Sequence, residues 1–338
     1  MQGKVCYDKE NDAAGELAAK REAFMTKKKW IVTAVVVVCA LVLCVPGVLA
    51  VRHYVKNKIT FTIDDTLPDG GGKRATVILL AGQSNASGCS LDEYLALSVG
   101  EEKHKEYQAG YDNVYINYLS GAHMSQAFVT CATLQGELEG AFGPELGLAE
   151  MLHETYPDET FFIIKCAWGG TNLYEQWRAP SSSGKTGELY RQFIAFVQTS
   201  IQYLESKNYD VSSEGLCWMQ GESDSFFVET ATAYEENLSC FVGDVRKKFA
   251  RYASEDGIAF VDAYIAALPS YWVEYELVNQ SKLAFASSSD LNVLVDTIAE
   301  GLTTAGEPVG APDMAHYDAL SEIKLGHLFA KALSPFFD

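Results

Sequence analysis

Apolar runs that end abruptly in turn residues recur along the chain from about residue 75. The first run, residues 76–81, is rich in β-branched and leucine residues and closes in Gly82-Gln83-Ser84-Asn85. A short, continuous apolar run closed by turn residues is typical of a buried parallel strand. The same pattern predicts strands at 114–118, 161–166, 214–219 and 258–262, with a weaker one at 292–296.

Apolar residues recur at helical spacing between these runs. The clearest stripe predicts a helix over 187–206 whose core-facing residues are Tyr190, Phe193, Ile194, Val197, Ile201 and Leu204. Further helices are predicted at 144–155, 228–252, 272–286 and 317–333, and a helix-like segment begins near Ser90. Strands that alternate with helices predict a parallel sheet with helices on both faces.

One stretch of the predicted domain, residues 119–142, has no clear period. It is rich in Gly, Gln, Ser and Thr and follows the carboxyl end of a predicted strand. A loop of this length is usually functional or disordered.

An uncharged apolar segment of 22 residues, 30–51, precedes this pattern. As a helix it would be about 33 Å long, enough to span a bilayer. Lys27-Lys28-Lys29 abuts its start, with Lys20 and Arg21 upstream, and Arg52, Lys56 and Lys58 lie beyond its end. The positive-inside rule favours a transmembrane signal-anchor with a cytoplasmic N-terminus and an exported C-terminal domain, by a modest margin because both flanks are basic.

A cleaved signal peptide, which would release a secreted protein, is the alternative. Val48-Leu49-Ala50 has the small residues of a cleavage site. The long apolar core and the 29 residues before it favour the uncleaved anchor. The predicted organisation is a disordered cytoplasmic tail at 1–29, the anchor at 30–51, a linker at 52–74 and one α/β domain at 75–338.

The charge and the cysteine content of the chain argue against several kinds of partner and site. The net charge is −19, of which residues 1–58 contribute +5 (10 basic, 5 acidic) and the rest −24 (16 basic, 40 acidic). This balance argues against nucleic acid as a partner. The five cysteines after residue 58 are an odd number without CxxC spacing, so we expect neither a disulfide framework nor a zinc site.

Residue types that suit acyl transfer follow several of the predicted strands. They are Ser84, the pair Gly169-Gly170, the run Gln220-Gly221-Glu222-Ser223-Asp224, and Asp313 with His316. Acyl transfer needs a nucleophile, an oriented base and donors for the oxyanion. Each feature alone has a plain structural explanation, as a helix cap, a turn or a packed side chain. Their placement on one predicted edge of the sheet favours a catalytic site.

Five motifs in order carry a resemblance to a known family. They are Gly82-Gln83-Ser84-Asn85, Phe142-Gly143-Pro144-Glu145, Gly169-Gly170-Thr171, Trp218-Met219-Gln220-Gly221-Glu222-Ser223-Asp224 and Asp313-x-x-His316. The set resembles the sialate O-acetylesterase-like branch of the SGNH hydrolases, which includes the acetylxylan esterases of carbohydrate esterase family six. The resemblance spans about residues 75–335. It implies a flavodoxin-like three-layer α/β/α domain and metal-free, cofactor-free hydrolysis of O-acetyl esters on sugars.

The resemblance also assigns catalytic roles. Ser84 would be the nucleophile and His316 the general base that later protonates the leaving sugar hydroxyl. Either Asp313 or Glu222 would orient the imidazole. Asp313 is favoured because it lies three residues before His316 and suits the usual triad geometry.

The oxyanion hole implied by the resemblance consists of the backbone N–H groups of Ser84 and Gly170 and the side-chain amide of Gln220. Candidate substrate-binding residues are Gln83, Asn85, Trp168 and Thr171, and the aromatic rings of Trp168, Tyr174 and Trp177 suit stacking on a sugar. The leading hypothesis is a membrane-anchored carbohydrate O-acetylesterase, of sialate or xylan type. The alternatives are a glycan-binding module with an inactive esterase fold, and an acetyl transferase or a lipid or thioester hydrolase.

Overall fold

The computed structural model describes residues 59–337. The predicted tail, the predicted anchor at 30–51 and the start of the linker lie outside these residues. Within residues 59–337, no helix combines the length and the apolar character needed to cross a membrane.

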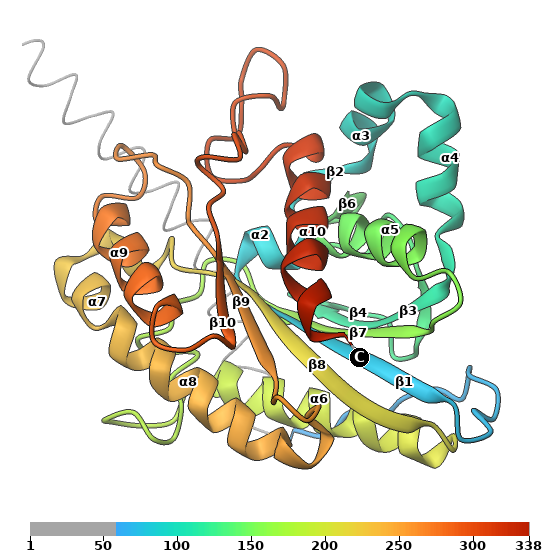
Figure 1. The fold of residues 1–338 in the computed structure, drawn as a ribbon. Helices are drawn as coiled ribbons and strands as arrows, with labels where there is room; N and C mark the ends of the chain where they lie inside the picture. The colour runs from blue at the N-terminus through green and yellow to red at the C-terminus, as the bar shows by residue number, and fades with distance from the viewer. Residues whose placement is uncertain (1–58, 338) are drawn as a thin grey trace, which may run out of the picture. The chain divides into compact units, whose positions relative to one another are not determined.

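A mostly parallel sheet forms the centre of the domain (Figure 1). Its six main strands run in the order β10-β9-β8-β1-β7-β3, and neighbouring pairs are all parallel. They are β1 (Arg74–Gly82), β3 (Tyr111–Ser120), β7 (Phe161–Ala167), β8 (Asp210–Met219), β9 (Ala259–Ala263) and β10 (Asn292–Val295). All six predicted strands are therefore confirmed, with ends that differ by a few residues. Both predicted features of the fold, the α/β class and the parallel sheet, are present.

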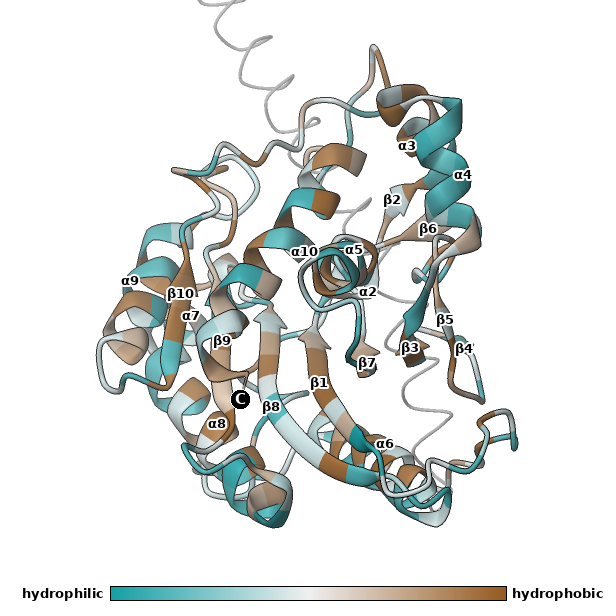
Figure 2. Ribbon diagram, turned by 45° about the vertical axis from the view of Figure 1, so that its right-hand side comes forward, coloured by the Kyte–Doolittle hydropathy of each residue, from teal (hydrophilic) through white to brown (hydrophobic). Residues whose placement is uncertain are grey.

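The most apolar strands lie at the centre of the sheet. Every residue of β7 is buried, and every residue of β1 after Arg74 is buried. Helices cover both faces: Figures 1 and 2 show α5 (Glu145–Thr155) and α10 (Ala319–Leu333) on one side, and α6 (Glu188–Ser206) and α8 (Tyr234–Phe249) on the other. A strand with helices on both faces has no polar side, which explains its continuous apolar run.

Some predicted helix boundaries need correction. The predicted helix at 228–252 is divided at Ala233 into α7 (Val228–Thr232) and α8, followed by a 3-10 turn at Ala250–Tyr252. The predicted helices at 272–286 and 317–333 begin later, as α9 (Tyr275–Ala286) and α10. The start of α10 is set by Asp318, whose carboxylate accepts a hydrogen bond from Ser321 N at 3.0 Å. An N-cap of this kind fixes where a helix begins.

Short elements that the periodicity did not resolve complete the domain. The aperiodic stretch 119–142 contains β4 (His123–Met124) and β5 (Val129–Cys131), both antiparallel to β3. It ends in β6 (Ala141–Phe142), which pairs with β2 (Ser90–Leu91). The helix-like segment near Ser90 is α3 (Asp92–Val99), and the polar α4 (Glu101–Ala109) follows it.

Helices α5 and α10 pack unusually closely. A Cβ added to Gly147 would lie 2.0 Å from Ile323 O, and one added to Gly326 would lie 2.2 Å from Pro144 O. Only glycine permits backbones to approach this closely. The contact holds α10, and with it the segment that precedes α10, against the sheet.

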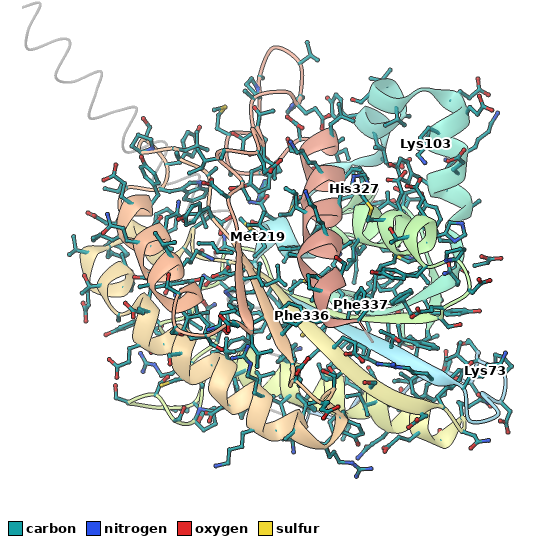
Figure 3. All side chains as sticks on the ribbon, in the orientation of Figure 1. Lys73, Lys103, Met219, His327, Phe336 and Phe337 are labelled. Atoms are coloured by element: carbon teal, nitrogen blue, oxygen red, sulfur yellow. The ribbon has the colours of Figure 1, made fainter. Side chains whose placement is uncertain are left out.

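Glu150 of α5 joins α4 and α10. Its carboxylate accepts contacts from Lys103 Nζ (2.5 Å), His327 Nε2 (2.7 Å) and Tyr107 Oη (2.6 Å), and Figure 3 shows Lys103 and His327 on the facing helices. Burial alone raises the pKa of Glu150, but these three neighbours outweigh it and lower the pKa to about 2. Glu150 therefore stays ionised at neutral pH.

A buried ion pair interrupts the apolar interior of the sheet. Lys165 of β7 and Glu145 of α5 have fully buried side chains, with Nζ and Oε2 2.6 Å apart. Glu145 Oε1 also accepts a hydrogen bond from Gly143 N at 2.9 Å, and Lys165 Nζ donates to Gln135 O at 3.1 Å. The glutamate of the Phe142-Gly143-Pro144-Glu145 motif is thus a structural partner of a buried lysine.

Replacement of Glu145 by alanine is expected to lower the free energy of unfolding by about 3–5 kcal/mol, because it leaves the Lys165 ammonium buried without its counter-charge. Urea titration followed by circular dichroism measures the change. Glu101→Ala is the matched control, since it breaks an exposed pair with Lys105 whose side chains are 83% and 67% exposed, and it should change stability little. Equal effects of the two substitutions would contradict a structural role for the buried pair.

Candidate active site

Ser84 follows a sharp turn at the carboxyl end of β1. A Cβ on Gly82 would lie 2.0 Å from Met219 O, and Gly82 has a φ of +143°. Glycine is needed here because no side chain fits between the two strand ends. The chain then enters α2 (Ser84–Ser87), which begins with Ser84. Ser84 is 7% exposed, at the sheet edge where α/β folds place their ligands.

His316 and Asp313 form a hydrogen-bonded pair in the segment before α10. His316 Nδ1 lies 2.7 Å from Asp313 Oδ2, and Asp313 Oδ1 accepts a hydrogen bond from Ala315 N at 2.9 Å. With Nδ1 engaged by the carboxylate, Nε2 is the ring nitrogen that remains for proton transfer, and the Cys89 side chain is hydrogen-bonded to the same imidazole. The sequence prediction that Asp313 accompanies His316 agrees with this geometry.

The ionisation of the pair follows from its surroundings. Burial alone lowers the pKa of His316, but the neighbouring Cys89 and Asp313 outweigh burial and hold the pKa well above the usual value. Burial likewise raises the pKa of Asp313, but the contact with His316 outweighs it and lowers the pKa. Burial raises the pKa of the Cys89 thiol. Asp313 is therefore ionised at neutral pH.

Asn85 connects the Ser84 turn with the His316 segment. Its Oδ1 accepts a hydrogen bond from Tyr317 N at 3.1 Å, and its Nδ2 donates to Glu222 Oε1 at 2.8 Å. The residue after the serine is thus bonded to the residue after the histidine. Asn85, predicted to bind substrate, has both ends of its side chain engaged in this way.

Glu222, the alternative acid, contacts Asn85 and not the imidazole. In residues 59–337 the second carboxylate oxygen of Glu222 has no hydrogen-bond partner. Burial raises the pKa of Glu222, with Asn85, Lys282 and His316 acting in the opposite direction. Asp313 is the carboxylate that the structure places on the histidine.

Two of the three predicted oxyanion donors are free to act. Within the described part of the chain, the backbone N–H groups of Ser84 and Gly170 donate to no protein acceptor. Gly170 has a φ of +67°, which is a conformation that glycine adopts readily. The N–H of Gly169, by contrast, donates to Glu137 Oε2 at 2.9 Å.

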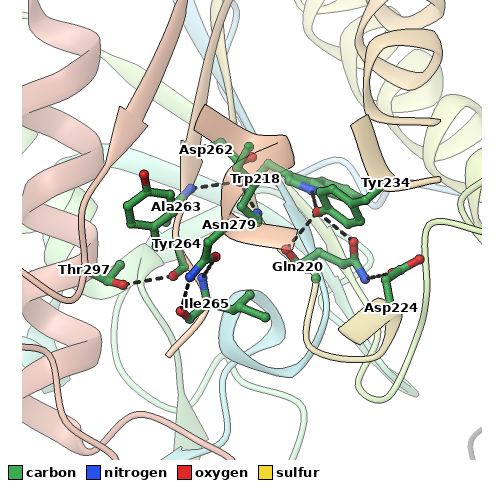
Figure 4. Close-up of polar contacts among 12 residues, drawn as sticks. Trp218, Gln220, Asp224, Tyr234, Asp262, Ala263, Tyr264, Ile265, Asn279 and Thr297 are labelled. Carbon is green, nitrogen blue, oxygen red and sulfur yellow. Dashed lines mark hydrogen bonds and ion pairs between the residues drawn. The ribbon is translucent and has the colours of Figure 1, made fainter. Parts of the chain in front are cut away.

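The third predicted donor, Gln220, is engaged elsewhere. Its Nε2 donates to Thr171 O at 3.0 Å. Figure 4 shows the contacts with Asp224 and Tyr234: Nε2 donates to Asp224 Oδ2 at 2.6 Å, and Oε1 accepts from Tyr234 Oη at 3.0 Å. An amide nitrogen carries two hydrogens, and both have acceptors here. We therefore correct the prediction: Gln220 braces the Thr171 turn and does not point a free amide at an oxyanion.

The remaining candidates for substrate binding hold the loops of the site together. Gln83 Oε1 accepts hydrogen bonds from Gly221 N (3.4 Å) and Ser223 N (3.2 Å). Thr171 Oγ1 donates to Trp168 O at 2.7 Å and accepts from Trp177 Nε1 at 2.9 Å. These side chains are buried, so their contacts shape the turns that surround Ser84.

The predicted sugar-stacking rings also differ from expectation. Trp177 is fully buried in an aromatic cluster with Phe193, Trp218 and Phe241, so it cannot face a sugar. The Arg178 guanidinium lies 4.8 Å from the centre of the Tyr174 ring and covers it. Trp168 is 6% exposed, and its Nε1 has no partner among residues 59–337. Of the three rings, only that of Trp168 retains a free polar group.

Three residues of the site escaped the sequence prediction of roles. Asp224 accepts hydrogen bonds from Leu173 N (2.8 Å) and Tyr174 N (3.0 Å), while burial raises its pKa to about 6. Glu137 contacts the Ser84 and Gly169 turns, and Cys89 lies beside His316. Two sequence features could have pointed to them: Asp224 lies inside a motif, and Glu137 lies inside the aperiodic loop.

The assembled site contains the parts that acyl transfer needs. A serine at the start of a helix, a histidine paired with a carboxylate and two free backbone N–H groups meet at one sheet edge. Within the described chain, no hydrogen bond links Ser84 Oγ to the imidazole. The described residues also contain no group of His, Cys, Asp and Glu side chains that could hold a metal ion.

Comparison with solved structures supports the fold. A protein from Arabidopsis thaliana is 18% identical, with a TM-score of 0.55 over 79% of this chain and 100% of that one. NanS is 15% identical, with a TM-score of 0.56 over 80% and 98%. A carbohydrate acetylesterase from Xanthomonas citri is 17% identical, with a TM-score of 0.51 over 77% and 56%. At these identities the similarity shows a shared fold.

Comparison with sequences places the chain in a family. No curated protein is similar enough to the chain to count as a match. Residues 74–334 match the family described as "Carbohydrate esterase, sialic acid-specific acetylesterase". This match covers most of the chain and coincides with the described domain. The chain is therefore a carboxylic ester hydrolase that belongs to the sialic acid-specific acetylesterase family of carbohydrate esterases.

Proposed function

We propose that this chain is a serine esterase that removes O-acetyl groups from carbohydrates with Ser84, His316 and Asp313 as its triad. The observation that carries the proposal is the bridge through Asn85, which brings the His316–Asp313 pair to the serine turn. The match to an acetylesterase family supports the acetyl ester as the bond that is cleaved. The three residues are all present, which argues against an inactive binding module.

In the proposed reaction, His316 Nε2 accepts the Ser84 hydroxyl proton as Oγ attacks the acetyl carbonyl carbon. The oxyanion accepts hydrogen bonds from the Ser84 and Gly170 N–H groups. His316 then donates the proton to the leaving sugar oxygen, and an acetyl-serine remains. A water molecule, deprotonated by His316, releases acetate and restores the serine. Asp313 stabilises the imidazolium that forms in both steps.

The separation of Ser84 Oγ from the imidazole fits this proposal. Catalytic hydrogen bonds are often long without substrate and shorten in the reacting complex. The serine turn is fixed to β8 through Gly82 and Gln83, whereas the Asp313 side chain is 49% exposed. If substrate binding closes this separation, we expect the histidine segment to move toward the more firmly held serine turn.

We further propose that residues 30–51 anchor the chain in a membrane, with the N-terminus cytoplasmic and the esterase domain outside. The support is the uncharged apolar run and its flanking lysines. We expect the full-length protein to stay in the membrane pellet after alkaline carbonate washing. External protease should remove the esterase domain from intact cells. Release into the carbonate supernatant would exclude the anchor, and release of the domain into the medium would indicate cleavage.

Replacement of Ser84 by alanine in the full-length protein should reduce hydrolysis of p-nitrophenyl acetate and of acetylated sugars by about 10³-fold or more. Ser287→Ala, at an exposed serine at the end of α9, is the matched control and should retain wild-type rates. Released acetate measures turnover, and mass spectrometry of the sugar products separates hydrolysis from transfer. If the wild type and Ser84→Ala are equally slow, the proposed function is wrong.

The pH dependence of kcat/KM tests whether Asp313 or Glu222 is the carboxylate of the triad. The base must be neutral, so kcat/KM of the wild type should rise with pH through the raised pKa of His316. Asp313→Asn removes a carboxylate that raises this pKa, so the midpoint should move to lower pH while the maximum rate falls by about 10³–10⁴-fold. Glu222→Gln preserves an acceptor for Asn85 and should cost much less. A loss confined to Glu222→Gln, with folding preserved, would reverse the assignment.

A further inference from the structure

The loop between β3 and α5 holds a carboxylate that the proposed mechanism does not use. Glu137 lies in the aperiodic stretch 119–142 and is half-buried. Its backbone N–H donates to Gly88 O at 2.8 Å, just after α2. The loop therefore attaches Glu137 directly to the segment that carries the nucleophile.

The Glu137 side chain is enclosed by the turns that follow three adjacent strands, β1, β7 and β3. Its Oε2 accepts hydrogen bonds from Ser87 Oγ, after β1, and from Gly169 N, after β7. The turn after β3 passes it at Gly121, where an added Cβ would lie 2.7 Å from Glu137 Cγ. An added Cβ on Gly169 would lie 2.8 Å from Glu137 Oε2. Glycine at both positions leaves the space that the carboxylate fills.

The two hydrogen bonds reach the two segments that supply the oxyanion donors. Ser87 is in the same helical turn as Ser84, and Gly169 directly precedes Gly170. Donors stabilise an oxyanion efficiently only when they are held in place before the charge develops. We propose that Glu137 is a positioning residue that fixes the Ser84 and Gly170 N–H groups relative to each other. This inference rests on the proposed esterase function.

The geometry makes the role depend on the length of the side chain more than on its charge. Both partners donate, so the amide oxygen of glutamine at the same place can accept both hydrogen bonds. Aspartate keeps the charge but is one methylene shorter, so it cannot reach Ser87 and Gly169 from the same backbone position. A residue that acted through its charge, or as a base, would show the opposite order.

The test compares Glu137→Gln, Glu137→Asp and Glu137→Ala in the full-length protein, with Glu139→Ala at the exposed residue two positions on as the matched control. With p-nitrophenyl acetate, Glu137→Ala and Glu137→Asp should lower kcat by about 10²–10³-fold and change KM by less than about threefold. Glu137→Gln should stay within about tenfold of wild type, and Glu139→Ala should match it. The rate at which a fluorophosphonate labels Ser84 should fall in the same order, because the phosphonyl oxygen occupies the oxyanion hole.

Each outcome bears on the inference. The proposed positioning role would be overturned if Glu137→Asp were as active as the wild type or more active than Glu137→Gln. It would also be overturned if the substitutions changed KM alone and left kcat unchanged. If Glu137→Ala does not fold, the relative activities of Glu137→Gln and Glu137→Asp still test the role. If the wild type shows no acetate turnover but labels at Ser84, the labelling order tests Glu137 while the proposed function fails. Absence of both turnover and labelling overturns the two together.

Discussion

The close approach of the β1 turn to the end of β8 fixes the position of Ser84, the proposed nucleophile. Gly82 leaves no space for a side chain beside Met219 O, and Gln83 N donates to the same carbonyl oxygen at 2.9 Å. On the other flank, Trp168 N donates to Gly82 O at 3.1 Å. The turn is thus held between the ends of β7 and β8. Because Ser84 directly follows this turn, the same contacts hold it in place, and the other groups of the site are positioned relative to it.

The sheet could be predicted from the sequence because a parallel strand with helices on both faces is apolar along its whole length. Lys165 is the informative exception, since a fully buried lysine is tolerated only because Glu145 pairs with it from a helix 20 residues away in sequence. The polar helix α4 was not predicted, because its sequence has no apolar pattern. It has few apolar positions and is held in place by ion pairs such as Lys103 with Glu150. An ion pair between residues on different helices leaves no periodic signal in a sequence.

The residue types of the site could also be predicted, but not their partners. Motifs at strand ends, which meet at one edge of the sheet, point to Ser84 and the glycine turn, and the Asp313-x-x-His316 motif before the last helix points to the histidine. Whether an amide is free is decided by acceptors far away in sequence. The amide of Gln220 is engaged by Thr171 O, 49 residues away, and the carboxylate of Glu137 accepts from Ser87, 50 residues away. Sequence periodicity carries no information about such contacts, so they required the structure.

The carboxylates of the site divide according to their exposure. Asp224 and Glu222 are buried, and burial raises the pKa of each, that of Asp224 to about 6. Both accept hydrogen bonds from amide groups and shape loops. Asp313 is half-exposed, and its contact with His316 lowers its pKa, so it carries a full charge at neutral pH. A group that must stabilise a transient imidazolium needs a permanent negative charge. The exposed carboxylate that contacts the histidine is thus the one that suits the proposed catalytic role, and the two buried carboxylates suit the bracing of loops.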